Sequence, residues 1–322
     1  MKTVNWGIIG CGDVAEVKSG PAFKNVHHSS LLAVMRRNKE KAEDFAKRHQ
    51  VPYHFDDAQA VLAHPEINAV YIATPPSTHL QYALQGLEAN KDVYLEKPMT
   101  LNTAEAEQLC EALKNSSSKL TVAHYRRRLP AFLKVKELLD HAKIGEIISV
   151  DIQILQPKMS NIIATTEEHW RLDPSISGGG YFHDLAPHQL DLMLHWLGPV
   201  ERYAGYATNE DPSSKVATTV NGIMHFKNGV QFRGLWSFNT AEDKKDECKI
   251  YGTTGNITFS FYGDKVILNK NGETFIFDFE NPVHIQQPMI EATVKYFSHL
   301  GPNPCSASEG LAVMKVMDAF TK

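Results

Sequence analysis

The chain has 322 residues, of which 43% are hydrophobic, and its formal net charge is -4 at pH 7. This length predicts two hydrophobic cores and about two domains, because a single core seldom grows beyond about 250 residues. The near-neutral balance gives no overall bias towards nucleic acid or an anionic membrane, and no apolar stretch is long enough to span a bilayer.

The first third of the chain alternates between strand and helix patterns. Short apolar runs predict buried parallel strands over residues 4–9, 31–35, 69–73, 92–95 and 120–123. Helical spacing between these runs predicts helices over residues 39–49, 79–89 and 103–115. This βαβ series predicts an α/β domain with a doubly wound parallel sheet over residues 1–123.

The first apolar run ends in a glycine motif, Gly10-Cys11-Gly12-Asp13-Val14-Ala15. Gly10 permits a tight turn, and Gly12 lets the backbone approach phosphate oxygens at a helix N-terminus. Ala15 takes the small-residue position where the helix crosses the strand. The motif is typical of a dinucleotide-binding turn, and an ordinary βα turn is the alternative.

The end of the second predicted strand indicates which cofactor is preferred. Arg36 and Arg37 follow Met35, and no acidic residue occurs before Glu40. NAD sites commonly carry an acid here for the ribose 2′-hydroxyl, whereas an arginine accommodates the 2′-phosphate of NADP. We therefore expect NADP to be preferred over NAD, the alternative being two solvated arginines at a helix start.

A charged pair, Glu96 and Lys97, stands before Pro98 at the end of the strand predicted over residues 92–95. The carboxyl ends of parallel strands are where open α/β sheets bind their ligands. A lysine amine at such a place can be desolvated and used for acid-base work. We expect Lys97 at the mouth of a cofactor cleft, although a solvated loop would also contain such residues.

Beyond His124 the pattern changes. A helix is predicted over residues 129–142, and strands over 147–155, 216–226, 229–238, 248–251, 256–261, 265–268 and 274–279. Turns such as Lys227-Asn228-Gly229 predict hairpins. We expect an α+β domain over residues 124–322, with one antiparallel-rich sheet and helices on one face. A second copy is expected to cover the other face, giving a homodimer or homotetramer.

Residues 178–191 combine three glycines with Asp184 and His188. A helix that begins after the glycines would place these two side chains at i and i+4, where a carboxylate can orient an imidazole for proton transfer. An amphipathic helix with its polar face in water is the alternative. Asp191 and His195 continue the stripe, which could bind a metal, but salt bridges explain it as well, and we predict no catalytic metal.

These motifs together resemble a known family. Gly10-x-Gly12-x-x-Ala15, Ala73-Thr74-Pro75-Pro76-Ser77-Thr78-His79, Glu96-Lys97-Pro98 and the glycine, Asp184, His188 segment occur in the order of the glucose-fructose oxidoreductase, inositol dehydrogenase and rhizopine-catabolism (Gfo/Idh/MocA) family. The resemblance covers nearly the whole chain. It implies an N-terminal Rossmann domain, a C-terminal domain with a large open mixed sheet, and a nicotinamide cofactor between them.

The resemblance also implies contacts for individual residues. It assigns the cofactor to the glycine motif and to Thr74, Pro75, His79, Glu96 and Lys97. It assigns the substrate to Tyr125, Arg126, Trp170, Arg171, Asp184 and His188. His79 could instead cap a helix, and Trp170 could be domain packing. Residues 126–128 are three consecutive arginines, which cannot all point the same way, so at least one should be solvated or salt-bridged.

The expected chemistry is reversible hydride transfer between nicotinamide and a hydroxyl-bearing or carbonyl carbon of a sugar, cyclitol or related polyol. Lys97 is the expected proton-transfer residue, assisted by His188, and Asp184 orients the histidine or grips a substrate hydroxyl. Two alternatives stay open at this point. One is NAD-dependent glycoside hydrolysis with no net redox, and the other is a non-catalytic cofactor-binding protein.

The cysteines indicate the compartment. They are widely scattered and form no CxxC pair: Cys11, Cys110, Cys248 and Cys305. This spacing predicts neither disulfides nor structural zinc. The first residues run directly into a strand, without the basic and apolar regions of a signal peptide. We therefore expect a cytoplasmic protein.

Overall fold

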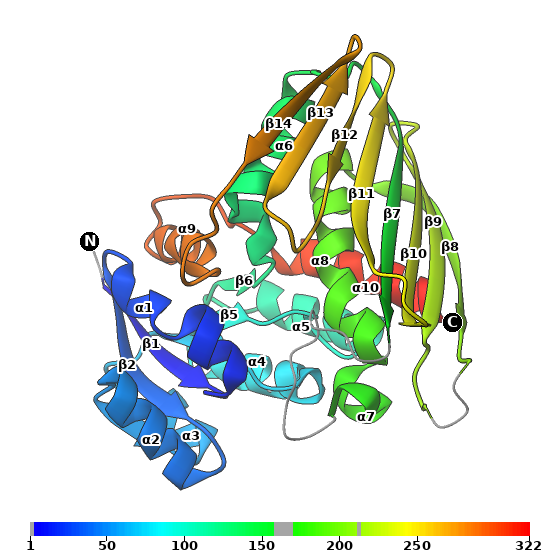
Figure 1. Ribbon diagram of the computed structural model, residues 1–322. Helices are drawn as coiled ribbons and strands as arrows, with labels where there is room; N and C mark the ends of the chain where they lie inside the picture. Colours follow the sequence, from blue (N-terminus) through cyan, green and yellow to red (C-terminus); the bar gives the residue numbers. More distant parts are fainter. Residues whose placement is uncertain (1–2, 158–169, 211–213) are drawn as a thin grey trace. The chain divides into compact units, whose positions relative to one another are not determined.

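The computed structural model describes residues 3–157, 170–210 and 214–322 (Figure 1). The chain divides into two compact units. The first unit extends up to Arg126 and includes Pro282–Met314, and the second contains Arg127–Asn281 and Lys315–Lys322. The expected domains, 1–123 and 124–322, stay a prediction. The compact units differ from them in one respect, because residues 282–314 return to the first unit after the chain has formed most of the second.

The first unit is built on a six-stranded sheet with the order β3-β2-β1-β4-β5-β6, and every neighbouring pair is parallel. The strands are β1 (Val4–Ile9), β2 (Ser29–Met35), β3 (Tyr53–Phe55), β4 (Ala69–Ile72), β5 (Asp92–Leu95) and β6 (Leu120–Val122). The predicted doubly wound sheet is confirmed. The sequence pattern missed β3, because three residues that are exposed or half-buried carry no apolar run. The strand order reverses at β1, which is where such sheets bind ligands.

The helices of the first unit are α1 (Ala22–Asn25), α2 (Lys39–His49), α3 (Ala58–Ala63), α4 (His79–Glu88), α5 (Thr103–Lys114) and α9 (Gln287–Phe297), with short turns η1 (Ala15–Ser19), η2 (Pro76–Thr78) and η3 (Tyr125–Arg128). The three predicted helices, α2, α4 and α5, are confirmed to within a residue at their ends. Asn38 caps α2 by accepting from the Lys41 N–H, and Asn102 caps α5 by accepting from the Glu105 N–H. These caps satisfy backbone donors that have no partner within the helix.

Helix α9 belongs to the first unit although it follows the whole second sheet in the sequence. It buries Phe297, whose ring lies 5.6 Å from the ring of Trp6 in β1. The Trp6 ring in turn contacts Phe23 of α1 at 4.8 Å between centroids. The aromatic core therefore holds the returning segment against the start of the chain.

The second unit is built on an eight-stranded sheet with the order β14-β13-β12-β11-β7-β10-β9-β8. Its strands are β7 (Ile147–Pro157), β8 (Val200–Thr208), β9 (Thr219–Phe226), β10 (Gln231–Thr240), β11 (Lys245–Gly252), β12 (Gly255–Phe259), β13 (Lys265–Lys270) and β14 (Glu273–Asp278). Strands β7 and β10 pair in parallel, and the other neighbouring pairs are antiparallel. The expected mixed, mostly antiparallel sheet is confirmed. The sequence pattern did not predict β8, whose residues are mostly exposed and carry no clear alternation.

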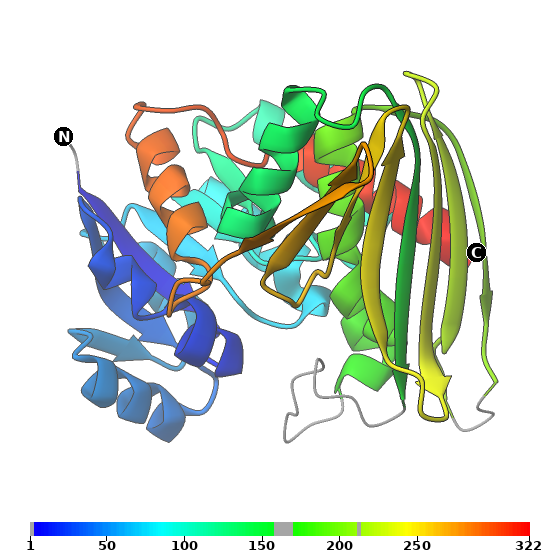
Figure 2. The ribbon, with the colours of Figure 1, turned by 45° about the horizontal axis from the view of Figure 1, so that its top comes forward.

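The two faces of this sheet differ. In β9, Val220 and Met224 are buried, whereas Asn221 and Ile223 are exposed. Helices α6 (Pro130–Asp140) and α8 (Gly180–Leu197) lie on the buried face (Figure 2). Among the described residues of the second unit, the opposite face carries no helix (Figure 2). The remaining helical elements are η4 (Trp170–Leu172), α7 (Pro174–Ser177) and α10 (Ala307–Thr321).

Glycines make room for the end of α10 on the covered face. Gly205 of β8 and Gly222 of β9 are cross-strand neighbours, and the Phe320 side chain lies on both. A Cβ at Gly222 would lie 2.0 Å from Cε2 of the Phe320 ring. The last turn of α10 is therefore seated on a backbone surface that only glycine can provide.

We expect Gly222→Ala to destabilise the protein by about 1–3 kcal/mol, because the new methyl group overlaps the buried ring. The urea unfolding midpoint should fall while the slope stays constant. Asn221→Ala, on the exposed face of the same strand, is the matched control and should change stability by less than about 0.5 kcal/mol. Equal midpoints for the two variants would show that Phe320 moves aside without cost.

Candidate functional site

The glycine motif forms the turn between β1 and the first helical segment. The N–H groups of Gly10 and Cys11 both donate to the Met35 carbonyl, at 2.9 and 3.0 Å, which ties the turn to the end of β2. Gly10 has a φ of +98°, and a Cβ there would lie 2.8 Å from Cγ2 of Thr74. A Cβ at Gly12 would have no atom within 4 Å. Gly10 is thus required by the turn itself, whereas Gly12 borders open space.

The residues that follow Gly12 begin a helix whose second half, Ala15–Ser19, is a π-helical turn. Ala15 is fully buried, as expected for the small residue of the motif, and Asp13 is exposed. π-Helical turns recur at functional sites because they displace a helix face locally. The start of a helix next to a glycine is a place where backbone N–H groups can bind an anion.

Arg36 and Arg37 follow the last residue of β2. Arg36 is half-buried and donates its backbone N–H to the Phe55 carbonyl at 3.1 Å, whereas Arg37 is exposed. Burial raises the pKa of the Cys11 thiol to about 11, and the positive charge of Arg36 opposes this rise. The charge of Arg36 therefore acts on the glycine turn.

The loop after β4 contains Thr74, Pro75 and His79. The His79 ring is fully buried, with Nδ1 2.8 Å from the Pro98 carbonyl oxygen and Nε2 2.8 Å from the Thr74 carbonyl oxygen. Burial is the main reason that its pKa is lowered. His79 begins α4, but its ring joins the loops that follow β4 and β5. The Thr74 hydroxyl accepts from the Thr78 hydroxyl at 2.7 Å.

The turn after β5 contains Glu96 and Lys97. The Glu96 side chain is buried, and its Oε1 accepts from the Tyr71 hydroxyl at 2.5 Å and from Nε2 of Gln286 at 2.6 Å. Its Oε2 accepts from the backbone N–H of Lys97 at 3.2 Å. Lys97 is half-buried, and the Lys97–Pro98 peptide bond is cis.

No sequence motif predicted the two side chains that meet Glu96, Tyr71 and Gln286. Burial, followed by the Glu96 carboxylate, raises the pKa of the Tyr71 hydroxyl well above its usual range, so the hydroxyl keeps its proton and donates it. Tyr71 lies inside an apolar strand, and Gln286 is 190 residues from Glu96 in the sequence. The sequence does show an acidic residue, Glu96, at the end of a buried strand. A buried carboxylate requires hydrogen-bond donors, but the sequence does not show which residues provide them.

In the second unit, the expected helix after the glycines is confirmed as α8. Asp184 accepts from Nε of Arg171 at 2.8 Å, and the Arg171 guanidinium lies 4.5 Å from the centre of the Trp170 ring. His188 follows one turn later on the same helix and is buried. The structure thus gathers Trp170, Arg171 and Asp184 in one cluster, with an arginine as the partner of Asp184.

The arginine run 126–128 also has a defined structure. Arg127 donates to both oxygens of Asp191, at 2.9 and 2.7 Å, in a pair whose side chains are 3% and 1% exposed. The expectation that at least one of these arginines is salt-bridged is confirmed. In the first unit, the buried Arg126 guanidinium lies 5.5 Å from the centre of the Tyr125 ring. Asp191, one of the four residues of the stripe, is therefore held by an arginine.

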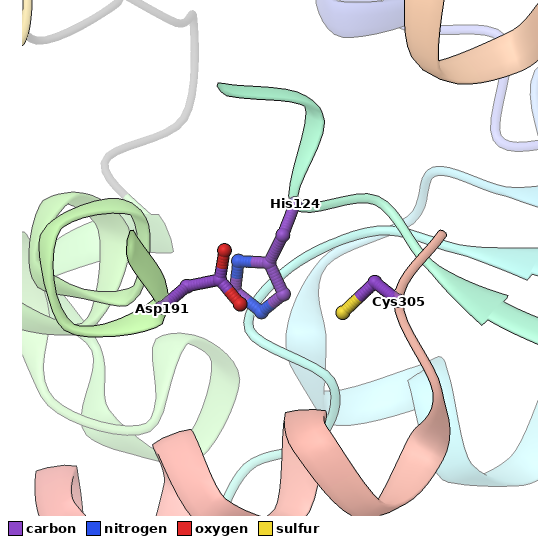
Figure 3. A group of neighbouring side chains, drawn as sticks. All are labelled: His124, Asp191 and Cys305. Atoms are coloured by element: carbon purple, nitrogen blue, oxygen red, sulfur yellow. The ribbon is translucent and has the colours of Figure 1, made fainter. Parts of the chain in front are cut away.

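A histidine and a cysteine of the first unit form another buried group. His124 and Cys305 offer an imidazole nitrogen and a thiol within 4.8 Å of each other (Figure 3). Asp191, also drawn in Figure 3, belongs to the second unit. Within the first unit this pair offers two potential ligands, which is fewer than the three or four protein ligands of ordinary zinc sites.

Across the described ranges, no helix is long and apolar enough to cross a membrane.

Comparison with known proteins relates this geometry to a family. Residues 4–124 match an oxidoreductase family described as having an NAD-binding Rossmann fold, and residues 132–258 match the GFO/IDH/MocA C-terminal domain. The chain is 56% identical over 317 residues to an oxidoreductase of Formosa agariphila, with 98% of each chain covered.

Two further proteins extend the comparison. The chain is 26% identical over 310 residues to D-xylose 1-dehydrogenase (NADP(+)) of Haloarcula marismortui, which covers 92% of this chain and 83% of that protein. A solved oxidoreductase from Thermotoga maritima has a TM-score of 0.87 at 26% identity, covering 99% of this chain and 95% of that chain. The chain therefore belongs to the GFO/IDH/MocA family of oxidoreductases, with an NAD(P)-binding Rossmann domain at its N-terminus.

Proposed function

We propose that this protein is an NAD(P)-dependent dehydrogenase or reductase that acts on a CH–OH group of a sugar, cyclitol or related polyol. One observation carries the proposal, a continuous series of contacts from the glycine turn to Lys97. Gly10 borders Thr74, the Thr74 carbonyl contacts His79, and the same ring contacts the Pro98 carbonyl next to Lys97. The D-xylose dehydrogenase relative supports the substrate class.

The residues present fit a dinucleotide. The open space beside Gly12 and the helix N-terminus behind it suit a pyrophosphate, and Thr74 and Pro75 are proposed to border the ribose and nicotinamide. When bound, the nicotinamide supplies or takes the hydride. We assign to Lys97 the transfer of the proton at the substrate oxygen.

In the second unit, we assign substrate contacts to Arg171, Asp184 and His188. The Arg171 guanidinium fixes the Asp184 carboxylate, and we assign to this carboxylate the binding of a substrate hydroxyl. His188, buried one turn away on α8, would assist proton transfer. We assign Tyr125, Arg126 and Trp170 to the same substrate role, on the family resemblance.

We propose that the reaction uses no metal. Two of the four stripe residues support this, because Asp184 is paired with Arg171 and Asp191 with Arg127. A guanidinium that already donates to a carboxylate competes with a cation for the same oxygens. Assays in the presence and absence of a chelator should therefore agree.

We propose a cytoplasmic location. The four cysteines support it, since none of them is in a disulfide: Cys11, Cys110, Cys248 and Cys305. Free thiols are the usual state in a reducing compartment.

The protein should bind NADPH more tightly than NADH, because the half-buried Arg36 can pair with a 2′-phosphate. Arg36→Ala should weaken NADPH binding by about tenfold, which is about 1.4 kcal/mol, and leave NADH binding nearly unchanged. Fluorescence titration measures both affinities. Lys39→Ala removes a nearby exposed charge and serves as the control. If Arg36→Ala weakened the binding of NADPH and NADH by the same factor, that result would contradict the NADP assignment.

Lys97→Met should leave NADPH binding and the melting temperature nearly unchanged and lower turnover by roughly a hundredfold, because it removes the proton-transfer group. The assay follows NADPH absorbance with aldoses, cyclitols and anhydrosugars, beginning with D-xylose. Lys114→Met, an exposed lysine of α5, is the control. Near-normal turnover in Lys97→Met would assign Lys97 a structural role. Glycoside cleavage without net change in NADPH would favour a hydrolase.

The protein should be at least a homodimer through the open face of the eight-stranded sheet. On that face Ile223 is 60% exposed and Tyr206 is 80% exposed, and we assign these apolar side chains to a contact with a second copy. Light scattering should give at least twice the chain mass, and Ile223→Asp should release monomers because it buries a charge. Leu300→Asp, an exposed position in the first unit, should have no effect. A wild-type monomer at micromolar concentration would refute the assignment of this face.

A further inference from the structure

We infer that Gln286 is a positioning residue for Lys97. Its side-chain amide fixes the buried Glu96 carboxylate, and that carboxylate holds the backbone of Lys97. The inference rests on the proposed function of Lys97 and adds a residue that the motifs do not contain. Gln286, Tyr71, Tyr94, Glu96 and Lys97 all belong to the first unit.

The amide of Gln286 has one favourable orientation. Its Oε1 accepts from the Tyr94 hydroxyl at 3.0 Å, and its Nε2 donates to Glu96 at 2.6 Å and lies 3.4 Å from the Tyr71 hydroxyl oxygen. An exchange of oxygen and nitrogen would direct a carbonyl at the carboxylate and an NH₂ group at a hydroxyl donor. The two tyrosine hydroxyls therefore determine which way the amide points.

The backbone around Lys97 is held on both sides. The N–H of Lys97 donates to Oε2 of Glu96 at 3.2 Å, and the carbonyl of the next residue, Pro98, contacts the buried His79 ring at 2.8 Å. Because the Lys97 side chain starts from this backbone, the position of its amine depends on the carboxylate. A displacement of about 1 Å at a reacting group can cost on the order of a hundredfold in rate.

Gln286 itself is anchored to the segment that follows the glycine motif. It is 1% exposed, and its backbone N–H donates to the carbonyl of Lys18, in the turn that follows the glycine motif, at 3.2 Å. Ser19 of the same turn donates to the Tyr71 hydroxyl oxygen at 3.1 Å. A buried polar network of this kind stabilises a fold less than apolar packing of similar volume would. We attribute the presence of this network to its effect on the position of the turn that contains Lys97.

The test is Gln286→Leu, which keeps the side-chain volume and removes the donor. Lysine amines are labelled with trinitrobenzenesulfonate. The labelling rate of Lys97 is then divided by that of the exposed Lys114, both measured by peptide mass spectrometry. Relative to the wild type, we expect the labelling ratio to rise about threefold or more in Gln286→Leu, because the turn that contains Lys97 loosens. We expect kcat to fall roughly tenfold, while the affinity for NADPH changes by less than about twofold. Thr293→Val, which removes a buried hydrogen bond to Met289 in the same returning segment, controls for general destabilisation.

Tyr94→Phe is the second variant, in case Gln286→Leu does not fold. It removes only the donor that orients the amide, and should shift the labelling ratio in the same direction. A ratio equal to that of Thr293→Val in folded variants would overturn the inference and leave the proposed function intact. Unchanged kcat in Gln286→Leu, alongside a strong loss in Lys97→Met, would overturn it as well. If Lys97→Met keeps its turnover, the proposed function fails, and the labelling ratio still decides whether Gln286 positions Lys97.

Discussion

A buried carboxylate has to be met by donors, and Glu96 is where this requirement organises the first unit. Its two oxygens are reached by a hydroxyl from β4, an amide from the returning segment and the backbone N–H of Lys97. The loss of any one donor would leave a buried ionisable group undersatisfied, which costs more than a neutral hydrogen bond contributes. The strand ends, the returning segment and the turn with Lys97 are therefore placed by one side chain.

The same constraint explains why the chain returns to the first unit after forming the large sheet. The apolar contact of Phe297 with Trp6 seats α9, and the Gln286 side chain then reaches Glu96 and Tyr94. Apolar packing supplies most of the stabilisation, because it scales with buried area, while the hydrogen bonds supply direction. The carboxyl edge of the parallel sheet, where such folds bind dinucleotides, is thus completed by residues far away in the sequence.

In the second unit, arginines are the partners of the acidic residues of α8. Asp184 and Asp191 stand on one helical stripe with His188, and each accepts from an arginine that precedes α8 in the sequence. The helical spacing correctly predicted a shared face for these side chains. It could not reveal the arginines, because a salt bridge joins residues brought together by the fold, here 13 and 64 positions apart.

The sequence by itself determined the local structure: the glycine turn, the alternation of strands and helices, the helix after residues 178–180, and the period-two sheet with one exposed face. These follow from backbone conformation and from the repeat of apolar residues, which are properties of neighbouring positions. It did not reveal β3 or β8, which are short or mostly exposed. Only the tertiary structure decided that Gln286 and Tyr71 meet Glu96, that His79 joins two loops, and that arginines hold Asp184 and Asp191. Hydrogen-bond partners across a fold depend on distances in space, and a single sequence records only the order of residues along the chain.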